Sequence, residues 1–279
     1  MSAGAWHEVG NGVFYRRYNP VDVSVGVILG PQGATVIDTR NNPAEARELR
    51  DDVSSEFGRP IAAVVNTHAH YDHCFGNQVF AAAGIPIYGH HLIPRHFQRF
   101  EAPRLHEVQR QPSVEPDKSW SQVKLTSPSV LIDHSQSLLL GGREVELLVL
   151  PPGHTETDLA VHIPDAGVWF LGDVVEESGP PMFGSGSFPL GWPLVLESLT
   201  RQIQESDRLV PGHGAVVTRD FVLAQGRKIA ELAVTLSDAY AQGLAPEQIS
   251  YPRALREYWP QEFLRPAAVD AYTQLAGLG

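Results

Sequence analysis

The chain has 279 residues, of which 43% are hydrophobic and 19% are charged, and its formal net charge is −11. This length and composition fit a soluble globular protein with one large α/β domain, or with one domain and an appendage. The acidic charge argues against a nucleic-acid partner, because nucleic-acid-binding proteins usually present a basic patch. The single cysteine, Cys74, excludes a framework of intramolecular disulfides.

The first 20 residues contain neither a basic leading segment nor a continuous apolar stretch, so they do not resemble a secretory signal. Apolar runs also stay below the roughly 18 residues that a membrane-spanning helix needs. We therefore expect a cytoplasmic protein that acts on a small molecule and has no membrane partner. The oligomeric state is left open by the sequence.

Strands and helices alternate through the first third of the chain. This alternation favours an α/β architecture. The expected elements are a hairpin of strands over 23–29 and 34–37, a helix over 43–57, a buried strand over 61–65, a helix over 76–83 and a strand over 85–88.

The rest of the chain begins with residues 90–125, where four prolines interrupt any long helical pattern, so we expect a helix and a long surface excursion. The Gly-, Pro- and Ser-rich stretch over 176–193 is too apolar for a simple linker and is expected to cover a pocket. The remaining expected elements are strands over 130–132, 137–140, 144–150, 159–163 and 168–171, helices over 193–206 and 220–242, and short helical pieces over 245–279.

The most specific motif is the run from His68 to His73, which directly follows the apolar strand over 61–65. His68, His70, Asp72 and His73 place four possible metal ligands within this run. Neutral imidazole and carboxylate suit zinc and related metals, and a loop at a strand end can direct alternate side chains to one point. A lone histidine is more often an ordinary polar loop residue, but this spacing favours a metal site.

Three further turns each follow a strand and carry one ligand-type residue. His154, Asp173 and His213 lie in these turns, each next to a glycine. Taken singly the signals are weak, because an aspartate on a turn more often caps a helix. Their shared position at strand ends is typical of a site at one edge of a sheet.

These residues make the chain similar to the metallo-β-lactamase superfamily, whose signature is HxHxDH followed by a distant His, an Asp and a final His. The resemblance covers about residues 20–217 and implies an αβ/βα sandwich of two mixed β-sheets flanked by helices. We expect residues 1–220 to form the catalytic domain and residues 221–279 a helical extension packed on it. The implied ligands are His68, His70 and His154 for a first metal, Asp72, His73 and His213 for a second, and Asp173 as a bridge between them.

Two divalent ions, most readily zinc but also iron or manganese, would lower the pKa of a shared water from about 15.7 toward neutrality. The resulting hydroxide is the expected nucleophile, and Asp72 is the catalytic residue expected to orient it. Asp38, Thr67 and Thr155 are candidates for fixing the imidazoles from behind. For Asp38, an ordinary turn or capping role is an equal alternative.

Other features have a structural and a functional interpretation. Phe183, Phe188 and Trp192 are expected either to line the substrate pocket or to pack their loop onto the core. Cys74 is expected to be a small buried residue, and Tyr71 is expected to point away from the metals. The histidines and arginines over 90–110 either attract an anionic substrate or form a solvated helix face.

Within the superfamily, this ligand set resembles that of hydroxyacylglutathione hydrolases and acyl-homoserine lactonases. The resemblance implies hydrolysis of an ester, lactone or thioester, with β-lactam hydrolysis at most a side activity. Persulfide dioxygenases are the alternative, since they hold one iron with residues corresponding to His68, His154 and Asp173. The acidic charge disfavours a nuclease, and the complete ligand set disfavours a non-catalytic metal-binding module.

Overall fold

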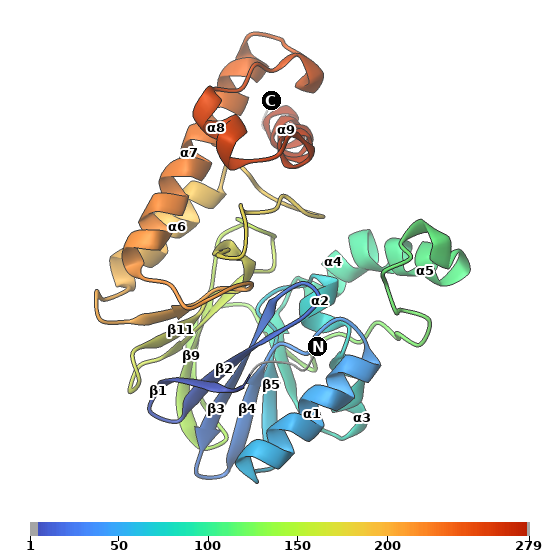
Figure 1. Cartoon of the computed structure of the whole chain (residues 1–279), viewed down its shortest axis with the longest axis vertical. Coiled ribbons are helices and arrows are strands. Elements are labelled where there is room, and N and C mark those ends of the chain that lie inside the picture. Colours follow the sequence, from blue (N-terminus) through green and yellow to red (C-terminus); the bar gives the residue numbers. More distant parts are fainter. Residues whose placement is uncertain (1–4, 278–279) are drawn as a thin grey trace.

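The computed structural model describes residues 5–277, and within this range a seven-stranded and a five-stranded β-sheet pack face to face (Figure 1). The first sheet has the strand order β1 (His7–Gly10), β2 (Val13–Tyr18), β3 (Val23–Gly30), β4 (Gly33–Ile37), β5 (Ile61–Val65), β6 (Ile87–His90) and β7 (Val130–Ile132). The second has the order β12 (Arg208–Val210), β11 (Val168–Phe170), β10 (Leu159–Ile163), β9 (Arg143–Val149) and β8 (Gln136–Leu140).

Both sheets are mixed. In the first, strands β4 to β7 pair in parallel and the three strands before them pair antiparallel. In the second, only the β11·β12 pair is parallel among the described residues. Parallel neighbours bring their carboxyl ends to one edge of a sheet, so the loop after β5 emerges at one edge of the first sheet and the loops after β11 and β12 emerge together at one edge of the second.

The helices and helical turns lie outside the two sheets or at their upper rim. They are α1 (Pro43–Phe57), α2 (Tyr71–Cys74), α3 (Asn77–Ala82), α4 (Ile93–His96), the π-helix η1 (Phe97–Glu101), α5 (Ala102–Arg110), η2 (Pro112–Val114), η3 (Gly172–Val174), α6 (Trp192–Gln202), α7 (Arg219–Ala241), η4 (Pro246–Gln248), α8 (Arg253–Tyr258) and α9 (Gln261–Ala276). Local sequence sets the bounds of α1: the Asn42 side chain accepts hydrogen bonds from two backbone N–H groups of the first turn, and Gly58 ends the helix in a left-handed conformation.

Three apolar cores explain the layers. The central core lies between the sheets and joins residues such as Ile37 of β4 and Val161 of β10. A second core packs α1 and α3 on the outer face of the first sheet, and a third packs α6 and α7 on the outer face of the second. The arrangement is therefore the αβ/βα sandwich of two mixed sheets that the resemblance implied.

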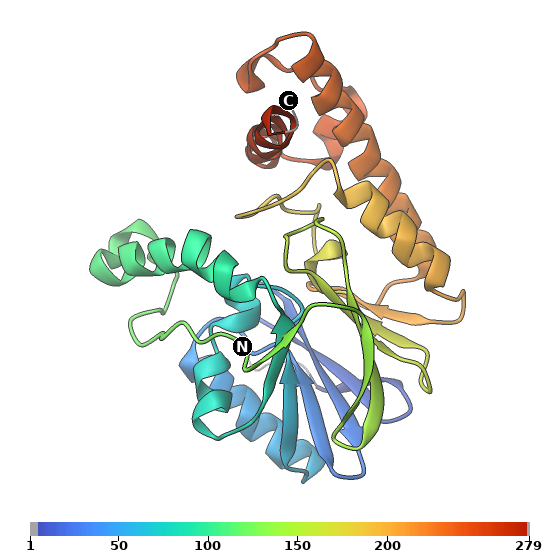
Figure 2. The same ribbon diagram turned by 180° about the vertical axis from the view of Figure 1, so that it is seen from behind.

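The C-terminal helices extend the layer on the second sheet. Figure 2 shows α7 running beside α6 and on beyond the sheet, where α8 and α9 lie. Leu236 of α7, Leu255 of α8 and Leu264 of α9 share one apolar core with Val195 of α6. Burial of these side chains stabilises the extension against the rest of the molecule.

Some elements differ from the sequence-based expectation. Strands β1 and β2 were not predicted, and residues 90–125 form α4, the π-helix η1 and α5 before an irregular return. Helix α6 was predicted to reach residue 206 but ends at Gln202, because Ile203 turns to an extended conformation and buries its side chain. Within residues 5–277, no helix has the length and apolar character needed to span a membrane.

Candidate metal centre

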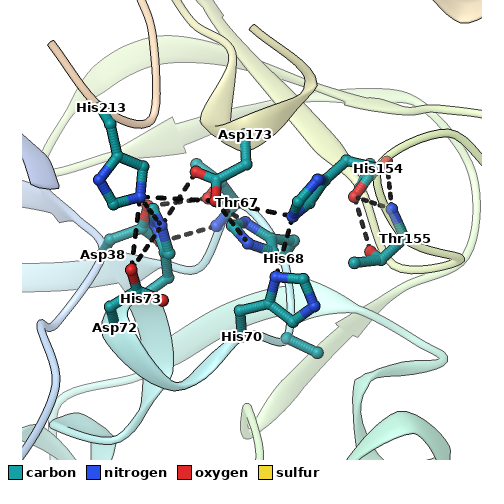
Figure 3. A network of polar contacts seen from close by, with 12 residues as sticks. Asp38, Thr67, His68, His70, Asp72, His73, His154, Thr155, Asp173 and His213 are labelled. Carbon is teal, nitrogen blue, oxygen red and sulfur yellow. Dashed lines mark hydrogen bonds and ion pairs between the residues drawn. The ribbon is translucent and has the colours of Figure 1, made fainter. Parts of the chain in front are cut away.

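The seven predicted ligands converge at one rim of the sandwich (Figure 3). The turn after β5 and the short helix α2 carry the four ligands of the motif. His154 follows β9, Asp173 lies in η3 directly after β11, and His213 follows β12. All seven side chains are buried, with exposed fractions of 8% or less.

The first cluster contains three histidines and an aspartate. His154 Nε2 lies 2.9 Å from His70 Nδ1 and 3.6 Å from Asp173 Oδ2, and His68 Nε2 lies 3.6 Å from the same oxygen. Ligand atoms of these four residues all lie within 4.8 Å of one another. Three imidazoles and one carboxylate are a donor set that zinc accepts.

The second cluster contains Asp72, His73 and His213. His213 Nε2 lies 3.3 Å from Asp72 Oδ2 and 3.4 Å from His73 Nε2. Asp173 also reaches this cluster, because its Oδ1 lies 3.0 Å from His73 Nε2 and its Oδ2 lies 3.5 Å from His213 Nε2. Asp173 therefore contacts both clusters, as a bridging carboxylate must.

Unpaired atoms test whether these residues fit metal ions. Among the described residues, buried His68 Nε2 and Asp173 Oδ1 have no hydrogen-bond partner. A buried polar atom without a partner is costly, and buried charges are usually paired or bound to metal. Both atoms belong to the convergent ligand set, so the side chains present fit metal binding.

The electrostatics of the two clusters differ. Burial, with a smaller contribution from neighbouring His70, lowers the pKa of His154 to about 3; burial and His73 likewise hold the pKa of His68 well below its usual range. Although burial lowers it, the carboxylate of Asp173 holds the pKa of His73 well above its usual range, and the same causes act on His213. The imidazoles of His68 and His154 are therefore kept neutral, and the second cluster stabilises positive charge.

An outer layer of hydrogen bonds fixes part of the site. Asp38 accepts from the backbone N–H and the hydroxyl of Thr67, at 2.8 Å in both cases, and from His73 Nδ1 at 2.8 Å. Thr67 Oγ1 also lies 3.1 Å from His68 Nδ1. Thr155 instead bonds Asp158, whose pKa burial raises to about 7.

Close packing around Asp173 requires a glycine. A Cβ atom on Gly212 would lie 1.9 Å from Asp173 Oδ1 and 2.8 Å from the Asp173 backbone nitrogen. The Gly212 backbone N–H bonds to the Gly172 carbonyl at 2.8 Å. The turn that presents His213 thus rests directly on Asp173.

A cavity of about 550 Å³ opens over the clusters. Its floor contains ligands from both clusters, and its walls come from five segments of the chain. The other lining residues are Val21, Tyr71, Arg104, Glu176, Ser178, Gly179, Pro180, Met182, Gly184, Ser185 and Phe263.

The three aromatic residues predicted for the pocket lie outside this lining. Trp192 and Phe183 are buried in the core under α6, with ring centroids 5.5 Å apart, and Phe188 is half-buried in the same loop. Trp192 does contact the site from behind, since its ring lies 5.2 Å from that of His154. The packing interpretation of this loop therefore describes Phe183 and Trp192, while exposed Met182 faces the cavity.

Arg104 and Tyr71 form one wall of the cavity, and Arg104 is one of the arginines over 90–110 that were expected either to attract an anionic substrate or to form a solvated helix face. The Arg104 guanidinium pairs with both oxygens of Glu115 at 2.6 Å and lies 4.8 Å from the Tyr71 ring centre. Lys118 Nζ lies 3.3 Å from the Tyr71 hydroxyl. Tyr71 was expected to point away from the metals, but it lines the cavity.

Glu176 and Phe263 are two more lining residues that sequence reasoning missed. Glu176 lies three residues after Asp173, and a ligand-type side chain so close to the bridge was a usable signal. Burial raises its pKa well above the usual range, although His213 lowers it. Phe263 lies in α9, and nothing in its local sequence points to the site.

Cys74 is buried and donates to the His68 carbonyl at 2.8 Å.

Comparisons with known proteins agree with this geometry. A family model described as the metallo-beta-lactamase superfamily matches residues 18–213. The human acyl-coenzyme A thioesterase MBLAC2 is 28% identical over 200 residues, covering 63% of this chain and 68% of that protein. A metallo-beta-lactamase from Pontibacter korlensis superimposes with a TM-score of 0.62 and 18% identity, covering 82% of this chain and 99% of the other.

A third similar structure extends over the C-terminal helices. A double mutant of the sec-alkyl sulfatase PisA1 matches 99% of this chain with a TM-score of 0.76 and 19% identity. The chain spans 51% of that protein. At such identity the likeness concerns the fold, and its coverage includes the helices after residue 220.

Proposed function

Because the chain belongs to the metallo-beta-lactamase superfamily and is a metal-dependent hydrolase, we propose that it binds two divalent ions and cleaves a small ester, lactone or thioester. Asp173 carries the proposal. Its two oxygens lie 3.0–3.6 Å from imidazole nitrogens of both clusters. One carboxylate in this position supports a pair of neighbouring ions better than a single one.

When bound, two ions would supply an acidified water and a Lewis acid for the substrate carbonyl. His68, His70 and His154 would hold one ion, and Asp72, His73 and His213 the other, with Asp173 between them. Asp72 lines the cavity and faces His213. Its carboxylate is the proposed acceptor that orients the attacking water.

The cavity walls support an acyl compound as the substrate. Val21, Pro180, Met182 and Phe263 give an apolar side that suits an acyl chain or lactone ring. The thioesterase relative acts on acyl-coenzyme A by its name, which supports a thioester among the three candidates. β-Lactam hydrolysis as a side activity, zinc as the native metal and a cytoplasmic location stay predictions.

The mononuclear dioxygenase alternative has less support. It needs only His68, His154 and Asp173, but Asp72, His73 and His213 also form a complete, buried second cluster. Buried polar side chains are kept at a cost unless something satisfies them. The presence of this second set of ligands supports the hydrolase over the dioxygenase.

Metal analysis of anaerobically purified protein tests the proposal. We expect about two ions per chain in the parent and a loss of metal in His154→Ala and Asp173→Ala. His134→Ala, at an exposed position away from the site, is the matched control. The same samples are screened against nitrophenyl esters, homoserine lactones and acyl thioesters. One iron per chain with oxygen uptake would favour the dioxygenase, and the absence of metal under every condition would exclude both functions.

A further inference from the structure

Two buried polar side chains that are not among the proposed metal ligands, His96 and Glu101, lie behind the first cluster. His96 and Glu101 are both 0% exposed. Within residues 5–277, neither ring nitrogen of His96 has a hydrogen-bond partner, and Glu101 Oε2 has none. Their polar atoms lie within 4.8 Å of an imidazole nitrogen of His70. Buried polar groups of this kind call for a functional or structural reason.

The π-helix η1 brings these two side chains together. His96 and Glu101 are five residues apart, which in an α-helix would turn them about 140° away from each other. The backbone N–H of Ala102 bonds to the carbonyl of Phe97, five residues earlier. This wider turn places residues five apart on nearly the same face, and such π-turns are frequent at functional sites.

Ser185 connects Glu101 to the metal ligand His70. Its hydroxyl donates to Glu101 Oε1 at 2.9 Å, and its carbonyl oxygen lies 3.0 Å from His70 Nε2. Because a carbonyl oxygen only accepts hydrogen bonds, Nε2 of His70 carries the ring proton, and Nδ1 keeps a lone pair that can bind a metal ion. That Nδ1 atom faces His154 Nε2 at 2.9 Å, on the side of the first cluster.

Two glycines allow the loop to approach this closely. A Cβ atom on Gly184 would lie 3.1 Å from His70 Cε1, and one on Gly186 would lie 2.9 Å from His96 Cε1. The loop thus rests against both imidazole rings. Its position is fixed by Ser185, whose hydroxyl is tied to Glu101.

We propose that Glu101 is a positioning residue for the first metal ion, acting through Ser185 on His70. By holding the Ser185 carbonyl in place, it sets both the tautomer and the ring orientation of His70. This inference rests on the proposed metal centre. It assigns a role to the segment over 90–125. The hydrogen bond between Glu101 and Ser185 connects this segment to a loop that follows 84 residues later in the chain.

Metal-binding measurements on the full chain test the proposal. Metal-free protein is titrated with Co²⁺ against a chromophoric chelator, and the visible spectrum of the first equivalent bound reports its ligands. Glu101→Ala and Ser185→Ala should each lower the affinity for this ion by about 10- to 100-fold, which is the usual effect of losing a residue that hydrogen-bonds to a metal ligand. The double variant should be no weaker than either single one, because both remove the same connection.

Two further variants separate positioning from a general loss of structure. Glu101→Gln keeps an oxygen that accepts from Ser185, so it should restore parent affinity. Glu107→Ala, on the exposed side of α5, should match the parent. Unfolding temperatures of the metal-free variants are measured alongside, and Ser185→Ala carries the test if Glu101→Ala does not fold.

The outcomes are distinct. Unchanged Co²⁺ affinity and spectrum in Ser185→Ala and Glu101→Ala would overturn the inference, as would a Glu101→Gln variant as weak as Glu101→Ala. A parent that binds no ion would instead overturn the proposed metal centre itself.

Discussion

The ring of His73 is held from behind by Asp38: the two side chains are 35 residues apart in sequence, and Nδ1 of the ring lies 2.8 Å from the carboxylate. This leaves Nε2 to face Asp173 at 3.0 Å. Asp38 adopts a left-handed backbone conformation with φ of 67° directly after β4, which a non-glycine residue rarely does. Its hydrogen bonds to Thr67 and His73 hold it there.

Replacing Asp38 should therefore weaken the binding of the second metal ion. We expect Asp38→Ala to reduce its affinity by about 10- to 100-fold, because the ring of His73 loses its partner. Equilibrium dialysis followed by elemental analysis measures this. Asp51→Ala, at an exposed carboxylate on α1, is the control. Equal retention of both ions in the two variants would contradict the prediction.

Gly212→Ala should remove both ions. The added methyl group would occupy the space of Asp173 Oδ1, at 1.9 Å, so the bridging carboxylate must move. Metal content and the unfolding temperature report the result. A variant with two ions per chain and parental activity would show that the turn adjusts without moving Asp173.

The matched control for this substitution is Gly226→Ala. Gly226 lies inside α7, and its added Cβ would meet Leu196 at an ordinary contact distance of 3.5 Å. Alanine in a helix interior is favoured over glycine by about 0.5–1 kcal/mol. Gly226→Ala should therefore keep its metals and unfold at a slightly higher temperature.

Metal binding should release protons at pH 7. Although burial lowers the pKa of His73 and of His213, the carboxylate of Asp173 raises both well above the usual value, so both rings are protonated in the metal-free protein. A metal ligand must be deprotonated, so the apparent affinity should rise with pH. Calorimetry in buffers of different ionisation enthalpy counts the protons, and a heat that does not depend on the buffer would oppose this prediction.

The same shifts set how stability depends on pH without metal. A raised pKa in the folded protein stabilises it fully below the unfolded value of about 6.5, and this contribution is lost as pH rises through the folded value. The metal-free protein should thus unfold at a lower temperature as pH increases above about 6.5. The metal-loaded protein, whose two rings are already deprotonated, should not show this trend.

The C-terminal segment after residue 241 hydrogen-bonds to the loop over 176–193, which lines the cavity. Trp259 Nε1 donates to the Pro181 carbonyl at 2.9 Å, and Gln274 Nε2 donates to the Ser187 carbonyl at 3.1 Å. Trp259→Phe keeps an aromatic ring but loses its hydrogen bond and should cost about 0.5–1.5 kcal/mol in the free energy of unfolding. With a substrate in hand, KM should change more than kcat. An unchanged KM would show that this tie does not shape the pocket.

The ligands could be predicted from sequence because each follows a strand whose apolar pattern is local. Parallel pairing brings the ends of β11 and β12 to one edge of the second sheet, where Asp173 and His213 follow them, and the packing of the two sheets places the end of β5, with His68, at the same rim. The fold class follows from the same strands and from the motif. Information within a few residues was enough.

The cavity walls could not be predicted in this way. Arg104, Met182 and Phe263 come from three segments that meet through tertiary packing, and their neighbours in sequence carry no common pattern. The aromatic side chains of the loop drew attention, but burial under α6 took Phe183 and Trp192 into the core.

The segment that carries Arg104 has an apolar cluster of its own. Leu105, Val108, Trp120 and Val123 pack with Phe75 and apart from the three large cores. Selection, in nature or in the laboratory, can therefore exchange α5 and the irregular segment that follows it for another sequence and so alter which molecules enter the cavity. The catalytic rim would survive such a graft, provided that the transplanted piece begins after Glu101.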